Sequence, residues 1–256
     1  MLKGFVTAIR TLTILPCPGR DANSFRSALP WFPLVGLILG LLAITPALLA
    51  THVATWLWPE ATAALTLILG VMLTRGLHLD GLADCVDGFG GGRRNREKIL
   101  AIMKDPHAGA FGQLALILTL LLQWVVLKQL IVLGALPWIL YAFVLSRTVQ
   151  VYLAVRFPYA RAEGGTAAPF IRDATQRDFI TALFVCSGLL LFAGNAITPM
   201  FFTLAAILLA AEAMGRWCQK RIGGITGDIL GAGSVLAENA VLLAGTAIAP
   251  ILSKGI

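Results

Sequence analysis

The stretch GAFGQLALILTLLLQWVVL, residues 109–127, contains no acidic or basic side chain over 19 residues. As an α-helix it would be about 28 Å long, close to the ~30 Å thickness of the hydrocarbon core of a bilayer. The stretch therefore predicts a membrane-spanning helix. Similar runs recur on both sides of it along the chain.

The composition of the whole chain agrees with this interpretation. Of its 256 residues, 58% are hydrophobic and only 13% are charged, whereas a soluble domain usually has about 25% charged residues. This argues against a soluble enzyme and against disordered, collagenous or disulfide-rich classes. We expect an all-α fold, a polytopic transmembrane helical bundle of about seven spans. The expected spans are residues 31–50, 61–77, 109–127, 136–155, 179–194, 199–217 and 235–252.

Most charged residues fall in three connections, residues 75–105, 147–178 and 216–238. If successive spans cross the bilayer in alternating directions, these connections and the N-terminal tail lie on one side of the membrane. That side then contains every Lys and Arg except Lys128 and Lys254. The positive-inside rule makes that side the cytoplasm. We therefore expect a multi-pass protein of the cytoplasmic (inner) membrane, with a cytoplasmic N-terminus and no cleaved signal peptide. The net charge of +7 then reflects cytoplasmic loops facing a lipid bilayer, and no nucleic acid partner is expected.

The connections on the other side, around residues 52–60, 128–134 and 195–198, are expected to be simple turns.

The segment HLDGLADCVDG, residues 78–88, stands at the end of the second expected span. If it is helical, Asp80, Asp84 and Asp87 lie at i, i+4 and i+7, so their carboxylates share one face. A divalent cation would offset their repulsion, and oxygen ligands suit Mg²⁺ or Mn²⁺. The alternative is a solvated acidic helix end beside basic residues.

A glycine-rich run, residues 88–92, leads into a basic cluster that begins at Arg93. We interpret it as a flexible loop that brings backbone N–H groups and cations to phosphate oxygens. A linker with positive-inside anchors is the alternative. Lys104 and Asp105 close the connection, although Asp105 also fits a turn or a helix cap.

A third region, residues 220–233, is again rich in glycine and contains Asp228, with Glu238 following. The glycines allow either close ligand approach or tight helix packing. Arg147 lies inside the fourth expected span, where an arginine needs a carboxylate or an anionic ligand.

Together these residues describe an active site at the cytoplasmic membrane edge, with carboxylates for a metal ion and cations for phosphate. This chemistry suits transfer of a phosphorus-containing group from a nucleotide-activated donor to an alcohol. No Walker A loop, H-E-x-x-H motif or Ser/His/Asp arrangement is present, which argues against ATP hydrolysis and zinc proteolysis. A secondary transporter is a second hypothesis, with acids such as Glu212 coupling ions, but its polar groups should gather at the midplane.

Several motifs along residues 5–240 closely resemble the cobalamin synthase family, the adenosylcobinamide-GDP ribazoletransferases. They are FPLVG (32–36), HLDGLAD (78–84) with DG (87–88), IMKD (102–105), SR (146–147), YAR (159–161) and GGITGDILGA (223–232). Ile14 stands where the family's arginine is expected, with Arg10 nearby as a substitute. The CDP-alcohol phosphotransferases also use clustered aspartates, but Asp84 follows Ala83 where their arginine should be.

The resemblance implies a single integral membrane catalytic domain over residues 1–256 that requires Mg²⁺. Its substrates would be adenosylcobinamide-GDP and α-ribazole, or α-ribazole 5′-phosphate, and its products adenosylcobalamin, or its 5′-phosphate, and GMP. By motif match, metal binding is expected at Asp80, Asp84 and Asp87, with Asp105, Asp228 and Glu238 as further ligands or a general base. Contacts with substrate phosphates are expected at Lys104, Arg147, Arg161, His78 and Arg93. A homo-oligomer is one option for the assembly.

Overall fold

The computed structural model describes residues 2–52 and 58–254, and all regular secondary structure in this part is helical. The α-helices are α1 (Leu2–Leu12), α2 (Phe32–Ala43), α3 (Thr45–His52), α4 (Pro59–Leu73), α5 (Leu77–Gly92), α6 (Arg96–Ile102), α7 (Ala110–Val132), α8 (Leu136–Arg156), α9 (Ala168–Ile171), α10 (Gln176–Leu190), α11 (Ile197–Ile222) and α12 (Gly227–Lys254). Two 3-10 helices, η1 (Phe25–Trp31) and η2 (Gly194–Ala196), complete the set. The all-α polytopic class expected from the sequence is confirmed.

The expected spans coincide with helices. Among the described residues, five helical segments are long and apolar enough to cross a membrane by themselves. They are Phe25–Ala50, which joins η1, α2 and α3, and helices α7, α8, α11 and α12. The two remaining expected spans correspond to α4 and α10, each of 15 residues.

The chain turns sharply between α4 and α5. The axes of these helices differ by 85°, and Arg75 and Gly76 at the junction both have positive φ, 55° and 67°. Two successive left-handed residues cannot continue a right-handed helix. The backbone N–H of Ile14 also donates to the Leu73 carbonyl at 2.8 Å. Helix α4 therefore ends four residues before the predicted end of the second span.

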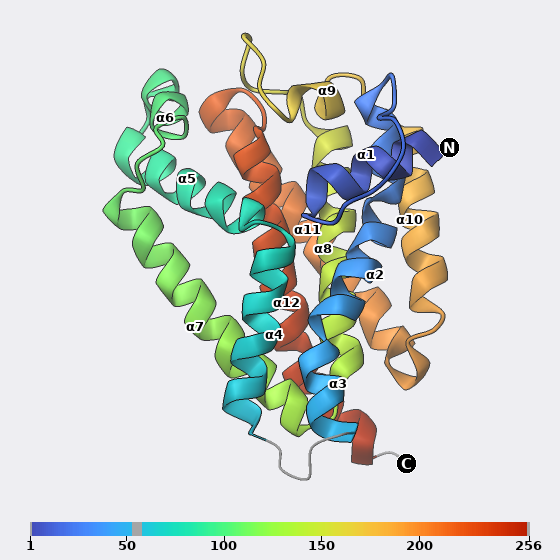
Figure 1. The fold of residues 1–256 in the computed structure, drawn as a ribbon. Helices are drawn as coiled ribbons and strands as arrows, with labels where there is room; N and C mark the ends of the chain where they lie inside the picture. Colours follow the sequence, from blue (N-terminus) through green and yellow to red (C-terminus); the bar gives the residue numbers. More distant parts are fainter. Residues whose placement is uncertain (1, 53–57, 255–256) are drawn as a thin grey trace.

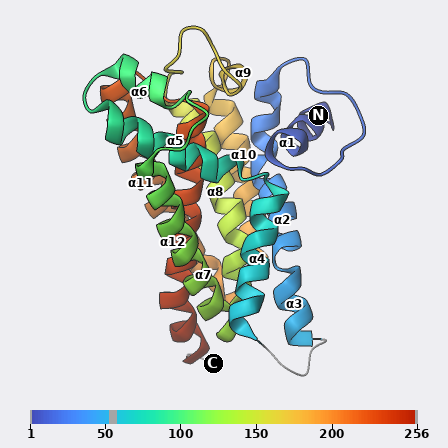
Figure 2. The same ribbon diagram turned by 60° about the vertical axis from the view of Figure 1, so that its left-hand side comes forward.

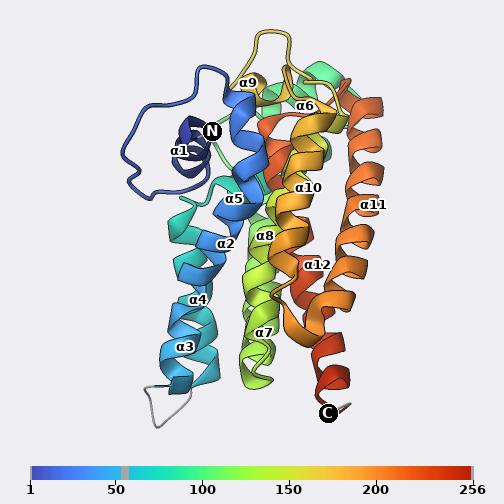
Figure 3. The ribbon, with the colours of Figure 1, turned by 90° about the vertical axis from the view of Figure 1, so that its right-hand side faces the viewer.

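Helix α5 lies across the bundle, whereas α4, α7, α8 and α12 run along it (Figures 1 and 2). Helices α1, α6 and α9 and the loops around them gather at the same end as α5, and the C-terminus lies at the opposite end (Figure 3). The predicted grouping of the N-terminal tail with the charged connections is thus present in the fold.

The opposite end has few charges. Lys128 and Glu60 pair there at 2.6 Å between Nζ and Oε1. The predicted turn at residues 52–60 falls partly outside the described residues. The turn predicted at 128–134 is shorter in the structure, because α7 continues to Val132.

Helix α8 is the centre of the bundle. In the most apolar 18-residue stretch of α8, 83% is buried inside the protein, compared with 28% of the corresponding stretch in α7 and 22% in α11. Helix α2 packs closely on it at Gly36, where an added Cβ would lie 2.5 Å from the Phe143 carbonyl oxygen. The side chains of α7 and α11 that point outward are mainly apolar, as expected for helices that face lipid.

A buried ion pair joins α8 to α12. Arg147 is 1% exposed, and its Nη1 lies 3.3 Å from Glu238 Oε2. The same nitrogen donates to the hydroxyls of Ser146 at 2.8 Å and Ser234 at 2.9 Å. Because an isolated charge is costly in an apolar interior, this network stabilises the contact of the two central helices.

We predict that Glu238→Gln destabilises the folded protein. The substitution leaves the Arg147 guanidinium buried without a countercharge, and breaking one side of a buried pair typically costs about 3–5 kcal/mol. Thermal unfolding in detergent should show a clearly lower Tm. The matched control is Glu60→Gln, which breaks the exposed pair with Lys128 and should cost at most about 1 kcal/mol. Equal Tm values for the two variants would contradict a structural role for the pair.

Candidate active site

The three aspartates of α5 lie on a helix, as their spacing predicted, but their environments differ. Asp80 is exposed, Asp84 is half-buried and Asp87 is buried. Helix α5 begins beside α12 within the bundle and extends outward to α6 and the start of α7 (Figure 1), so its three aspartates have different neighbours. The three carboxylates therefore differ in how accessible they are to a ligand.

Helix α5 packs against the start of α12 through glycines. A Cβ at Gly81 would lie 2.8 Å from the Asp228 carbonyl oxygen, and one at Gly231 would lie 3.2 Å from the His78 carbonyl oxygen. Only residues without side chains allow this approach. The contact brings Asp80 and Asp84 next to Asp228, in the first turn of α12.

Asp80, Asp84 and Asp228 form what we call the aspartate cluster. Asp84 interacts electrostatically with both other members and with Arg161. Asp228 accepts hydrogen bonds from Arg161 Nη2 at 2.9 Å and from Thr226 Oγ1 at 3.0 Å. Arg161 is thus the cation nearest to three mutually repelling carboxylates, and it lies where the motif match placed a phosphate contact.

Asp87 serves the fold. Its two carboxylate oxygens accept hydrogen bonds from the backbone N–H groups of Gly109 at 2.7 Å and Gly112 at 2.9 Å. These groups stand at the start of α7, where helix N–H groups lack partners within the helix. Asp87 therefore fixes α7 to α5, and its predicted metal role remains a prediction.

Two cavities meet at the aspartate cluster. The first, which we call the inner pocket, has a volume of about 370 Å³ and is lined by Asp80, Asp228, His78 and Gln150 among apolar side chains such as Phe170. The second, of about 560 Å³, shares Asp80. It also contains Arg10 and Arg75.

A third cavity, which we call the outer cleft, has a volume of about 700 Å³ and lies between α6 and the loop of residues 160–163. It is lined by Arg161 and by Lys104, which forms an ion pair with Glu163. The Lys104 ammonium lowers the pKa of the Glu163 carboxyl below its ordinary value. The ion pair Arg161–Asp228 stands between the outer cleft and the inner pocket.

Among the described residues, Asp105 and Arg93 form no hydrogen bond or ion pair with the aspartate cluster. Asp105 is exposed and accepts hydrogen bonds from the backbone N–H and the imidazole of His107, at 2.9 and 2.7 Å. These bonds lower the pKa of the Asp105 carboxyl. The structure thus supports the turn interpretation of Asp105. Arg93 has an exposed side chain, and its carbonyl accepts a hydrogen bond from Arg221.

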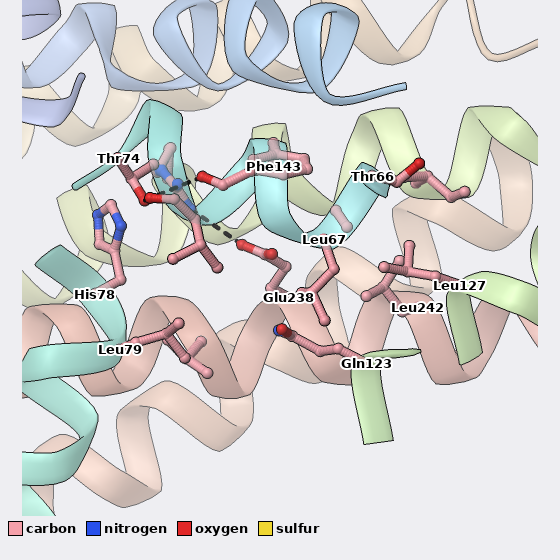
Figure 4. Close-up of a pocket in the computed structure, with 16 residues that line it drawn as sticks. Thr66, Leu67, Thr74, His78, Leu79, Gln123, Leu127, Phe143, Glu238 and Leu242 are labelled. Carbon is pink, nitrogen blue, oxygen red and sulfur yellow. Dashed lines mark hydrogen bonds and ion pairs between the residues drawn. The ribbon is translucent and has the colours of Figure 1, made fainter. Parts of the chain in front are cut away.

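Glu238 and Arg147 are brought together with His78 in a separate small cavity of about 40 Å³ inside the bundle. Figure 4 shows Glu238 pointing into this cavity, with His78 and Gln123 in different parts of its lining. The structure does not place Glu238 beside the aspartate cluster. The phosphate role expected for Arg147 also stays a prediction, because its hydrogen-bond and ion-pair partners here are the side chains of Ser146, Ser234 and Glu238.

The flexible loop expected at residues 88–92 is wrong, and of the two alternatives left open for residues 220–233 the structure shows tight helix packing. Residues 88–92 belong to α5, and an added Cβ at Gly88 would lie 2.6 Å from Met103 Cγ. Between α11 and α12 only residues 223–226 are non-helical. In both places glycine permits close helix packing, which outweighs its low helix propensity.

Sequence reasoning missed several polar residues around the site. Gln150 is buried at the inner pocket, and Thr226 holds Asp228. Arg10, which the sequence offered as a substitute for the arginine expected at Ile14, lines the cavity that shares Asp80. Gln150 gave no sequence signal, because one amide in an apolar span has many structural uses.

Among residues 2–52 and 58–254, no three His, Cys, Asp or Glu side chains are arranged so that they could hold a metal ion by themselves. The aspartate cluster nevertheless provides hard oxygen donors of the kind that Mg²⁺ prefers. Mg²⁺ in enzymes of phosphate chemistry usually takes only one or two carboxylates and completes its shell with substrate phosphates and water. The donor set therefore fits Mg²⁺ held jointly by protein and substrate.

Comparison with known proteins relates the chain to one family. The model of cobalamin-5-phosphate synthase matches residues 4–246. The chain is 48% identical over 249 residues to adenosylcobinamide-GDP ribazoletransferase of Chlorobium phaeobacteroides, covering 97% of this chain and 99% of the relative. It is 50% identical over 243 residues to the Chlorobaculum parvum protein of the same name, covering 94% of each. The Syntrophobacter fumaroxidans protein of that name is 41% identical over 242 residues, 93% of this chain and 90% of the relative.

No solved structure matches the chain. The family match covers nearly the whole sequence and includes the aspartate cluster, Arg161 and the glycines at which α5 meets α12. The chain belongs to the cobalamin-5-phosphate synthase family.

Proposed function

We propose that this protein is an adenosylcobinamide-GDP ribazoletransferase, which transfers the phosphocobinamide group to α-ribazole or α-ribazole 5′-phosphate and releases GMP. The observation that carries the proposal is the aspartate cluster with Arg161, placed at a cavity junction in a chain about 50% identical to proteins of that name. Carboxylates for a metal and a guanidinium for phosphate are the groups that phosphoryl transfer needs.

The reaction breaks one bond and forms another. A ribazole hydroxyl oxygen bonds to the phosphorus nearer the corrinoid, the P–O bond to GMP breaks, and the hydroxyl proton goes to a carboxylate. We assign the proton to Asp80, which lines both cavities that meet at the cluster. Its carboxylate has no hydrogen bond or ion pair within the part of the chain that the structure describes, whereas Asp228 is held by Arg161 and Thr226.

Asp84 and Asp228 would hold Mg²⁺ together with the diphosphate of the donor. When bound, the ion neutralises negative charge that develops on the phosphate oxygens. Arg161 adds a planar pair of N–H donors that matches two phosphate oxygens. Its present partner, Asp228, keeps the guanidinium positioned beside the cluster.

The second candidate function, secondary transport, has less support. The aspartate cluster lies where α5 crosses the end of the bundle (Figure 1), and transporters use acids near the midplane. Release of GMP from adenosylcobinamide-GDP by purified protein, with and without α-ribazole, tests the proposed function. Ribazole-dependent release supports it, and a complete lack of release contradicts it.

We predict that Asp80→Asn and Asp84→Asn give different kinetic defects. Asp80→Asn removes the proton acceptor and should lower turnover about 10²–10⁴-fold at an unchanged half-saturating Mg²⁺ concentration. Asp84→Asn removes a metal ligand and should raise that concentration as well as lower turnover. Asp173→Asn, an exposed aspartate outside the cluster, is the control with normal kinetics. Near-normal turnover in both cluster variants would contradict the assignment.

We also predict the orientation in the cytoplasmic membrane. The end of the bundle that carries α1, α5, α6 and α9 should face the cytoplasm, because the basic connections lie there. Reporter fusions should place the N-terminus and an insertion near residues 93–95 inside, and the C-terminus outside. Detection of both chain ends on one side of the membrane would refute this arrangement.

A further inference from the structure

The outer cleft has an unequal charge distribution. Its cations are Arg96, Lys104 and Arg161, and its carboxylates are Glu97 and Glu163. Lys104 neutralises Glu163 through their ion pair. The Glu97 side chain, on the first turn of α6, makes no hydrogen bond or ion pair within residues 2–52 and 58–254. Besides the Lys104–Glu163 pair, the cleft therefore offers two cations, Arg96 and Arg161, and one carboxylate without a protein partner, Glu97.

Arg161, which lines the outer cleft, has unused hydrogen-bonding capacity. Its side chain is only 10% exposed, and its Nε is buried without a partner among the described residues. A buried N–H group without a partner is costly and usually marks the place of a water or a ligand. Arg161 lines the outer cleft, and its Nη2 is used by Asp228.

The wall that carries Arg161 is rigidly held. Arg96 Nη2 donates to the Ala160 carbonyl at 2.9 Å, and Arg172 Nη2 donates to the Arg161 and Ala162 carbonyls at 3.1 and 2.8 Å. Tyr159 forms an isolated bridge with Ile225, next to Thr226. The cleft is therefore pre-formed, and its volume of about 700 Å³ is within the usual range for a nucleotide-sized ligand.

We propose that the outer cleft binds the guanine nucleotide end of the donor, with Arg161 on its phosphates and Glu97 on the guanine base; this rests on the proposed function. The Watson–Crick edge of guanine presents the N1–H and the 2-amino group, two neighbouring donors. A carboxylate has two acceptor oxygens and no donor, so it pairs with both. Adenine presents an acceptor at N1 and is rejected by the same carboxylate.

The arrangement also fits the geometry of the reaction. Attacking and leaving oxygens lie roughly in line on opposite sides of the phosphorus. With the nucleotide in the outer cleft and the acceptor in the inner pocket, the diphosphate lies at the Arg161–Asp228 pair between them. The released nucleotide then leaves through the exposed side of the protein, where Glu97, Lys104 and Glu163 lie.

Binding of GMP and AMP to the purified full-length protein in detergent tests the inference. Wild type should bind GMP at least tenfold more tightly than AMP. Glu97→Gln should weaken GMP binding about tenfold, because the amide has only one acceptor oxygen, and should not weaken AMP binding, because the amide N–H can donate to adenine N1. The matched control Glu60→Gln changes a glutamate at the opposite end of the bundle and should keep the wild-type preference. Equal binding of both nucleotides by wild type, no binding of GMP, or an unchanged preference in Glu97→Gln overturns the inference.

Turnover of adenosylcobinamide-GDP by the same preparations separates this inference from the proposed function. Turnover by wild type combined with an unchanged preference in Glu97→Gln places the nucleotide elsewhere and leaves the function standing. Selective GMP binding that depends on Glu97, without any ribazole-dependent turnover, supports nucleotide binding in the outer cleft and contradicts the proposed function.

Discussion

The contact between α5 and α12 sets the geometry of the candidate site. At this contact the backbone of one helix touches the backbone of the other, because Gly81 and Gly231 have no side chains. A side chain at Gly81 would clash with the Asp228 backbone, so the helices would have to move apart and separate Asp80 and Asp84 from Asp228. In an apolar bundle, where burial of nonpolar surface does not distinguish one helix contact from another, such close packing specifies the arrangement.

The rest of the bundle supports this contact through interactions between polar groups. These groups lie in an apolar interior that cannot solvate them, so each needs a partner within the protein. Arg147 and Glu238 join α8 to α12 below the site, and Asp87 joins α5 to α7 beside it. Each pair satisfies groups that would otherwise be costly to bury. The members of the aspartate cluster are the exception, since their repulsion is balanced within the described residues only by Arg161. In the proposed function, a charged substrate and a metal ion would supply the missing charge balance.

The sequence predicted the helices and the common end of the charged connections, because hydropathy and charge follow directly from residue type. It also predicted the helical spacing of Asp80, Asp84 and Asp87. It did not reveal the bend at residues 74–76, since this depends on two left-handed residues, one of which is Arg75. Helical packing of residues 88–92 depends on the neighbouring α6. The pairing of Arg147 with Glu238 depends on which helices are neighbours, and that information is tertiary.

The short helix α10 has a consequence for the surrounding lipids. Its 15 residues extend about 22 Å, less than the ~30 Å of an average hydrocarbon core. Exposed apolar side chains, Ile180 and Phe184, show that this helix faces outward (Figure 3). Helix α10 is not among the helices long enough to span a membrane by themselves, so acyl chains beside it would have to compress or tilt where it crosses the bilayer, whereas those beside the 26-residue α11 would not. Lipid length then acts unevenly around the protein, and thick bilayers strain the α10 side first.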